Sequence, residues 1–344
     1  MYKPKKLDKS AAEAARRRWA SIAKPLHGLG EFEDIIIQLA AVSGTAEVDI
    51  KKRTLVVVCA DNGVVKEGVT QTGQNVTKTV AENFLKGETS ACKMASATGF
   101  DLLVCDAGVV GGVKGAVDLR LGNGTKNIAE GPAMTADDAL KGVENGIAIV
   151  KKLKSEGCAL IATGEMGIGN TTTSSAVASV LLGKAPSEVT GRGAGLGTDG
   201  LKRKIRAIEK AIAINNPDKN DVLDVMSKLG GFDICTLAGV FVGGAVYGVN
   251  VIIDGFISAA AALCAERLVP GAADFMIASH SSRETAAEDI LRALGKRAVI
   301  HAGMCLGEGT GAVLMGPLLD ASLAVYSEMA TFGDIKIEEY KELC

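Results

Sequence analysis

The strongest constraint on this chain is a repeated alternation of two patterns. Short apolar runs end at a glycine or a polar turn, and amphipathic stretches of helical length follow them. This alternation is typical of βαβ units, in which helices cover a parallel sheet. The predicted strands are 54–60, 102–106, 159–163, 249–254, 275–279 and 298–302, and the predicted helices include 76–86, 136–154, 171–182, 200–215, 257–267, 283–294 and 310–329. The sequence therefore predicts an α/β fold with a parallel sheet.

Composition supports this fold class and excludes some partners. Aromatic residues are only 4% of the chain, so the core must consist of Ala, Val, Ile and Leu, as in buried parallel strands, and an all-β sandwich is disfavoured. Glycine supplies 42 of 344 residues, well above the usual share of about 7%, so many turns bring the backbone close to a neighbour. The net charge of −2 gives no electrostatic reason to expect nucleic acid or an anionic membrane surface as a partner.

The length of 344 residues fits two domains, or one α/β unit with an appendage. A helical region, 10–41, precedes the first predicted strand, and no strand follows the long C-terminal helix. We expect the two chain ends, 1–48 and 309–344, to form a small helical domain beside an α/β domain of residues 49–308. No linker rich in proline and serine separates these parts, so we expect one cooperative unit.

Cysteine and histidine give no metal signature. Eight cysteines occur singly, mostly in apolar runs, which predicts buried free thiols in a reducing compartment, the cytoplasm. None of the three histidines has metal-ligand spacing, so we expect no metal. Residues 1–21 are charged where a signal peptide needs apolar residues, so we expect no export by that route. The uncharged stretch 234–253 has GxxxG spacing, but it divides into a small-residue helix and a short strand, so we expect it to be buried in protein rather than in a membrane.

Two glycine-rich loops are candidates for binding an anion. Residues 163–172, TGEMGIGNTT, follow a strand and open a helix, where free N–H groups suit a phosphate, although a capped turn explains the pattern about equally well. Residues 191–197 form a second loop, and neither segment is a Walker A or GxGxxG motif. Basic residues follow the second loop, namely Lys202, Arg203, Lys204 and Arg206. Most of these should be solvated, while one can reach a phosphate as a point charge.

Acidic residues near glycines are the candidates for chemistry. Glu308 lies between two glycines and is either a general base or a cap at a helix end, and Glu165 is a second acid in a glycine setting. Two carboxylates beside a phosphate loop suggest chemistry at a sugar centre or a proton transfer. Asp254 and Ser282 follow buried strands, where they hold ribose hydroxyls or only stabilise turns. A triad of these two residues with His280 is not expected, because no GxSxG motif occurs.

Segments along nearly the whole chain resemble the nicotinate-nucleotide–dimethylbenzimidazole phosphoribosyltransferases. They are KPLHGLGEFEDIIIQLA, DNGVVKEGV, NFLKGETSACKMA, GPAM, GEMGIGNTT, KLGGFD, IIDGFISAAAAL, SHSS and LGEGTG. The resemblance implies a Rossmann-like sheet, a helical domain from both chain ends, and a dimer. It also implies transfer of the phosphoribosyl group of nicotinate mononucleotide to an aromatic base such as 5,6-dimethylbenzimidazole, without metal or cofactor.

The resemblance also implies residue roles. Glu308 matches the catalytic acidic residue, whose carboxylate accepts the proton of the aromatic base as that base attacks C1′. Glu165 matches the second acidic residue. The matching binding residues are Gly167, Gly193 and Lys204 for the phosphate, Asp254 and Ser282 for the nucleotide, and Met166 and Leu306 for the base.

The chain departs from the family near the predicted base pocket. Asn62 stands where many members have histidine, Thr72 and Gly73 replace a Ser-Pro pair, and Val80 aligns with a frequent glutamine. Thr72 is therefore also a predicted base-pocket residue, and the base can be a benzimidazole, a purine or a phenol. Alternatives are a phenol-accepting subunit of a heterodimer and a non-catalytic paralogue. A dehydrogenase is disfavoured because no GxGxxG motif follows a strand.

Overall fold

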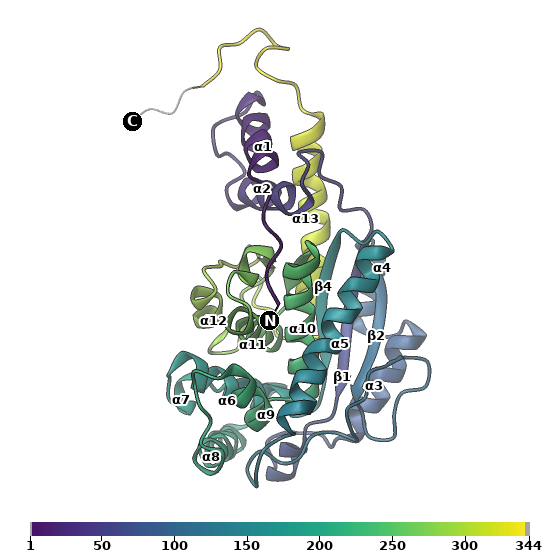
Figure 1. Ribbon diagram of the computed structural model, residues 1–344, viewed down its shortest axis with the longest axis vertical. Coiled ribbons are helices and arrows are strands. Elements are labelled where there is room, and N and C mark those ends of the chain that lie inside the picture. The colour runs from purple at the N-terminus through teal and green to yellow at the C-terminus, as the bar shows by residue number, and fades with distance from the viewer. Residues whose placement is uncertain (1, 341–344) are drawn as a thin grey trace.

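A single parallel sheet organises the chain. The computed structural model describes residues 2–340, and Figure 1 shows helices on both faces of this sheet. Within these residues the strands are β1 Arg53–Ala60, β2 Asp101–Gly108, β3 Val117–Asp118, β4 Leu160–Met166, β5 Asn250–Ile253 and β6 Met276–Ala278. They lie in the order β3-β2-β1-β4-β5-β6, and all neighbours are parallel. This is the Rossmann strand order, so the predicted α/β fold is confirmed.

The helices form two layers around the sheet. They are α1 Lys9–Ser21, α2 Glu31–Ser43, α3 Asn75–Lys86, α4 Ser90–Ala97, α5 Ala136–Ser155, α6 Asn170–Leu182, α7 Pro186–Val189, α8 Thr198–Asn215, α9 Val222–Leu229, α10 Phe232–Tyr247, α11 Phe256–Leu268, α12 Ala287–Ala293 and α13 Thr310–Glu328, with 3-10 turns at Gly63–Glu67 and Ala272–Phe275. In β1, Val56 and Val58 face the core that contains α5, α10 and α11, whereas Leu55 and Val57 face the core that contains α3, α4 and α13. Both faces are covered, and every residue of β1 is therefore buried.

The strand predicted at 298–302 is wrong. That segment forms only an isolated bridge between His280 and Ile300, and the N–H groups of Val299 and Ile300 both donate to the Ser279 carbonyl. Ser281 N–H donates to the Ile300 carbonyl at 2.9 Å and completes this one bridge, which no neighbouring pair of residues extends into a ladder. The predicted helix 283–294 is also shorter in the structure, since α12 spans Ala287–Ala293.

The uncharged stretch near residue 240 is a buried helix followed by a strand, as predicted. Helix α10 leads directly into β5, and it crosses α5 where two glycines face the partner backbone. A β-carbon on Gly239 would lie 2.1 Å from the Val143 carbonyl oxygen, and one on Gly146 would lie 2.1 Å from the Thr236 carbonyl oxygen. Glycine thus permits this close crossing. No helix in residues 2–340 is both long enough and apolar enough to span a bilayer.

Helices α1 and α2 lie beside the end of α13 at one end of the molecule (Figure 1). The Arg18 guanidinium donates to the Tyr326 carbonyl at 2.8 Å and to the Met329 carbonyl at 2.9 Å, and Trp19 packs edge-on against the Tyr326 ring. The beginning of α13 instead packs on the sheet, where Gly309 lies against Leu55. The division into domains 1–48, 49–308 and 309–344 stays a prediction, and Met1 and residues 341–344 lie outside the described range.

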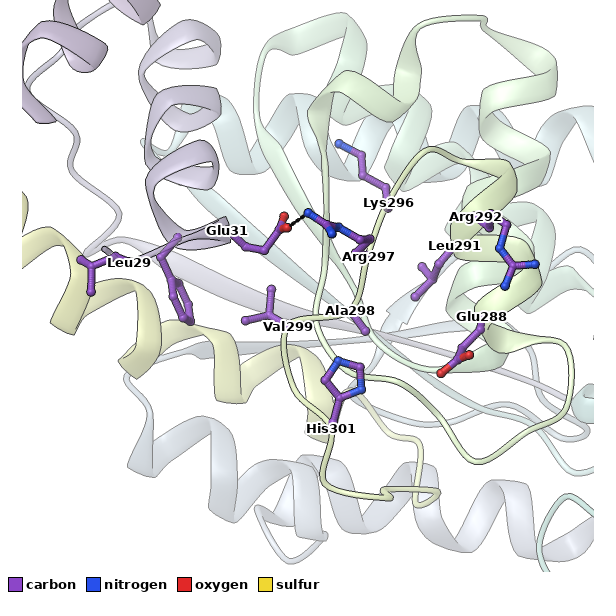
Figure 2. A pocket seen from close by; sticks show the side chains of 11 residues that line it. Leu29, Glu31, Glu288, Leu291, Arg292, Lys296, Arg297, Ala298, Val299 and His301 are labelled. Atoms are coloured by element: carbon purple, nitrogen blue, oxygen red, sulfur yellow. Dashed lines mark hydrogen bonds and ion pairs between the residues drawn. The ribbon is translucent and has the colours of Figure 1, made fainter. Parts of the chain in front are cut away.

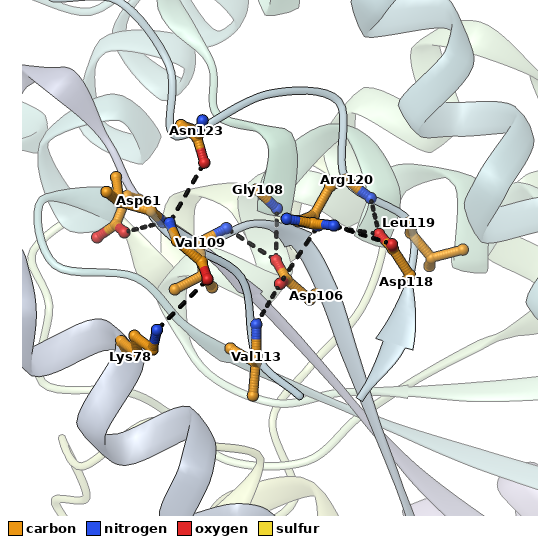
Figure 3. A network of polar contacts seen from close by, with 12 residues as sticks. Asp61, Lys78, Asp106, Gly108, Val109, Val113, Asp118, Leu119, Arg120 and Asn123 are labelled. Atoms are coloured by element: carbon orange, nitrogen blue, oxygen red, sulfur yellow. Dashed lines mark hydrogen bonds and ion pairs between the residues drawn. The ribbon is translucent and has the colours of Figure 1, made fainter. Parts of the chain in front are cut away.

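Two buried aspartates fix the loop that follows β2 (Figure 3). The Asp106 carboxylate accepts from the N–H groups of Gly108 at 3.0 Å and Val113 at 2.9 Å, and Asp61 accepts from Val110 N–H at 2.8 Å. Burial raises the pKa of Asp61. The Asp61 carboxylate thus anchors a loop at the carboxyl ends of β1 and β2.

Candidate active site

A cavity of about 250 Å³ opens beyond the carboxyl ends of β4, β5 and β6. Ligands of open parallel sheets bind beyond the carboxyl ends of the strands, where this cavity lies. Eight predicted site residues line the cavity, namely Glu165, Met166, Gly167, Gly193, Asp254, Ser282, Leu306 and Glu308. The loops after three strands and before α8 and α13 therefore meet at one place.

Glu308 is held in an unusual backbone conformation at the cavity wall. Its φ is +62°, between Gly307 at +86° and Gly309 at +93°, and a non-glycine residue rarely adopts this region. A β-carbon on Gly164 would lie 2.4 Å from the Glu308 carbonyl oxygen, so a side chain in β4 would displace the loop. The Glu308 Oε2 atom accepts from Ala91 N–H, in the first turn of α4, at 3.1 Å. The half-buried carboxylate is thus fixed at a helix N-terminus, where negative charge is favoured.

Asp254 fixes the segment that carries Glu308. One carboxylate oxygen accepts from the N–H groups of Gly311 at 2.8 Å and Ala312 at 2.9 Å, and the other accepts from Gly309 N–H at 3.2 Å. These donors belong to the start of α13, whose free N–H groups need acceptors. Burial raises the pKa of Asp254, and its N–H donors and the nearby His280 oppose the rise. In the structure Asp254 caps α13, and its predicted contact with a nucleotide stays a prediction.

Glu165 occupies a different environment from Glu308. Glu165 lies near the carboxyl end of β4 and is 7% exposed. The Asn170 amide donates a hydrogen bond to its Oε2 atom. Burial raises the pKa of Glu165 to about 8, and the charges of Asp233 and Asp254 add to the rise. Burial also raises the pKa of Asp233 to about 6. At neutral pH Glu165 therefore holds a proton.

This assignment predicts a pH-dependent stability. A carboxyl group whose pKa is higher in the folded state than in the unfolded state binds its proton more tightly in the folded state. Its contribution to the unfolding free energy is complete below the pKa of the unfolded state, and for Glu165 it is lost as pH rises toward 8. Between pH 5.5 and 8.5 the wild-type protein should lose at least about 1 kcal/mol more unfolding free energy than Glu165→Gln. Urea unfolding at both pH values measures this difference. The exposed control Glu130→Gln should follow the wild type, and an unchanged pH dependence in Glu165→Gln would refute the assignment.

Lys204 lies one layer behind the cavity. The side chain is fully buried in α8, and Nζ donates to Thr171 Oγ1 at 2.8 Å and to the Gly191 carbonyl at 3.2 Å. Burial lowers the pKa of Lys204 to about 8. Thr171 lies in the first turn of α6 and lines the cavity beside Gly193. A buried ammonium, a glycine loop and a helix N-terminus thus meet, an arrangement that suits an anion.

Several cavity residues were not identified as site residues from the sequence. The sequence around Asn170 suggested a helix cap, and the sequence around His280 suggested a turn. Nothing in the sequence marked Glu284 apart from its charge. Cys305 is exposed at the cavity, whereas the other described cysteines are free and buried, and Cys344 lies outside the described residues. Conversely, Thr72 is exposed and lies outside this cavity, and its predicted role in base binding stays a prediction.

A larger hollow lies elsewhere, between α2 and α12, with a volume of about 680 Å³ (Figure 2). The ion pair of Glu31 with Arg297 crosses it, and Leu29, Leu291 and Val299 supply apolar walls. None of the predicted site residues lines it. Size alone therefore does not identify the active site, and the smaller cavity, which collects the acids and the glycine loops, is the candidate. Within residues 2–340 no group of three His, Cys, Asp or Glu side chains is arranged to hold a metal ion.

The chain is similar to known proteins along nearly its whole length. A family model described as phosphoribosyltransferase matches residues 5–337. The nicotinate-nucleotide–dimethylbenzimidazole phosphoribosyltransferase of Ruminiclostridium cellulolyticum is 46% identical over 341 residues, 98% of this chain and 97% of the relative. Its namesake from Acetivibrio thermocellus is 46% identical over 337 residues, 97% of this chain and 96% of the relative. The crystal structure of CobT from Thermus thermophilus superposes with a TM-score of 0.91 at 37% identity, covering 96% of this chain and 100% of that one.

The matches to these relatives and to the solved structure span almost the full length of both partners, and the family model matches residues 5–337. The chain belongs to the nicotinate-nucleotide–dimethylbenzimidazole phosphoribosyltransferase family.

Proposed function

We propose that this chain transfers the 5-phosphoribosyl group of nicotinate mononucleotide to 5,6-dimethylbenzimidazole or a similar base, and releases nicotinate. Full-length relatives carry the name of this reaction. The observation that carries the proposal is the pairing of Glu308 and Glu165 in one cavity with a glycine loop and the buried Lys204 behind it. Because the chain contains the site residues itself, a non-catalytic paralogue is not favoured.

Different parts of the cavity suit the phosphate, the ribose and the aromatic base. The phosphate binds at the start of α6, beside Gly167 and Gly193 and close to Lys204, and Asp254 and Ser282 lie on the ribose side. Apolar cavity residues, including Met166, Phe256, Ile257 and Leu306, provide a wall for the aromatic base. Leu306 is 53% exposed, so the mouth of this pocket is open to incoming base.

The chemical step needs one proton acceptor. A ring nitrogen of the base attacks C1′ of the ribose, and the bond from C1′ to the pyridinium nitrogen breaks with its electron pair moving onto nicotinate. The Glu308 carboxylate takes the N–H proton of the base, and attack opposite the leaving group gives an α-ribotide. Glu165 is protonated at neutral pH, so it acts as a hydrogen-bond donor and not as the base.

A reaction with the purified chain alone tests the proposal. Incubation with nicotinate mononucleotide and 5,6-dimethylbenzimidazole should yield nicotinate and an α-ribotide, detected by chromatography and NMR. Parallel reactions with adenine, phenol and p-cresol rank the bases. Absence of nicotinate release with every base would reject the proposal for the isolated chain.

Pairing with a second chain and a cytoplasmic location stay predictions. Light scattering coupled to gel filtration measures the first, and a mass of one chain in solution would contradict it.

A further inference from the structure

Glu284 is an acidic cavity residue that the proposed reaction does not use. It lies in the segment between β6 and α12, two positions after Ser282, and lines the cavity. Its Oε2 atom is buried and has no hydrogen-bond partner among the described residues. A buried carboxylate oxygen without a donor is unfavourable, so this placement needs an explanation other than stability.

The unpaired oxygen lies against the phosphate end of the cavity. A β-carbon on Gly191 would be only 1.9 Å from Glu284 Oε2, so glycine at 191 makes room for the carboxylate. The carbonyl of the same Gly191 accepts the hydrogen bond from Lys204 Nζ. Glu284 and Lys204 therefore both approach one residue of the loop that precedes α8.

Glu284 supplies a negative charge that balances the buried ammonium of Lys204. The two hydrogen-bond acceptors of Lys204 are the Thr171 hydroxyl and the Gly191 carbonyl, and neither carries a charge. Burial lowers the pKa of Lys204, and the charge of Glu284 opposes this lowering. The carboxylate thus helps to keep the buried ammonium protonated.

We propose that Glu284 is a placeholder for the substrate's phosphate. In the free protein the Glu284 carboxylate compensates the positive charge of Lys204, and the phosphate of the nucleotide takes over this role when it binds. The inference rests on the proposed function, because it needs a phosphate to bind beside Lys204. A phosphate and a carboxylate at one ammonium repel each other, so the two anions compete. Glu284 therefore weakens binding of the phosphate and leaves binding of the nucleoside part unaffected.

Calorimetric titration with two ligands tests this role. The ligands are nicotinate mononucleotide and the corresponding nucleoside, which lacks the phosphate. Glu284→Gln keeps the size of the side chain and removes its charge, so the Kd for the mononucleotide should fall by about 3- to 10-fold, as expected for one partly screened charge pair. The Kd for the nucleoside should not change. Glu284→Ala should act in the same direction and covers the case in which the glutamine variant fails to fold.

Glu288→Gln is the matched control, because it removes one negative charge from a neighbouring exposed position outside this cavity. Both Kd values should remain those of the wild type. If the wild-type chain does not bind the mononucleotide, the proposed function fails. If the wild type binds but Glu284→Gln binds the mononucleotide equally well or more weakly, or if the affinities for both ligands change by the same factor, the placeholder role is wrong and the proposed function stands.

Discussion

Glu308→Gln should lower turnover at least about 10²-fold while nicotinate mononucleotide still binds, because the change removes the proton acceptor and preserves the shape of the side chain. The amide oxygen of glutamine can still accept from Ala91 N–H, which holds the carboxylate in the wild type. The strained backbone of the segment stays as it is, since its glycines and the cap at Asp254 are unchanged. Steady-state kinetics gives the turnover, and calorimetry gives the Kd of the mononucleotide.

The control for this prediction is Glu130→Gln, an exposed glutamate outside the cavity, which should have wild-type turnover. Near-normal turnover of Glu308→Gln would remove Glu308 from its assigned role. Loss of mononucleotide binding together with turnover would instead make it a binding residue.

Gly239→Ala should destabilise the fold by at least about 2 kcal/mol, because the new methyl group meets backbone that cannot move without separating two helices. The β-carbon would lie 2.1 Å from the Val143 carbonyl oxygen, far inside van der Waals contact. An alanine in an open helical position would instead stabilise by about 1 kcal/mol. Urea unfolding at 25 °C measures the change, and Gly146→Ala, on the facing helix, should behave in the same way.

Gly131→Ala is the comparison variant, because a β-carbon there meets no atom within 4 Å and the backbone is not left-handed. Its stability should differ from that of the wild type by less than about 0.5 kcal/mol. A wild-type stability for Gly239→Ala would contradict the close helix crossing.

The fold class was predictable because burial on both faces leaves a direct trace in the sequence. Strand β1 is covered on both sides, and its residues 55–60 form a continuous apolar run. An apolar run also led to the wrong prediction of a strand at 298–302. This segment packs beside the sheet and pairs with it only through Ile300. Strand β3 was missed because it contains only two residues, Val117 and Asp118, and both are exposed.

The candidate site was predictable only in part. Glu308 and Glu165 stand out because glycines surround them, and a glycine-flanked acid between apolar segments is unusual. The contacts that position them join distant segments: Ala91 binds Glu308, and Asp254 caps α13. No local pattern encodes such pairings. The unpaired oxygen of Glu284 likewise became visible only when its neighbours in space were known.

A crystal structure of the chain with bound nicotinate mononucleotide tests the central claim most directly. The account predicts that the phosphate lies at the start of α6 near Lys204, and that the Glu308 carboxylate faces C1′ from the side opposite the nicotinate ring. A bound nucleotide whose C1′ lies outside the reach of Glu308, or whose phosphate occupies another part of the protein, would contradict it.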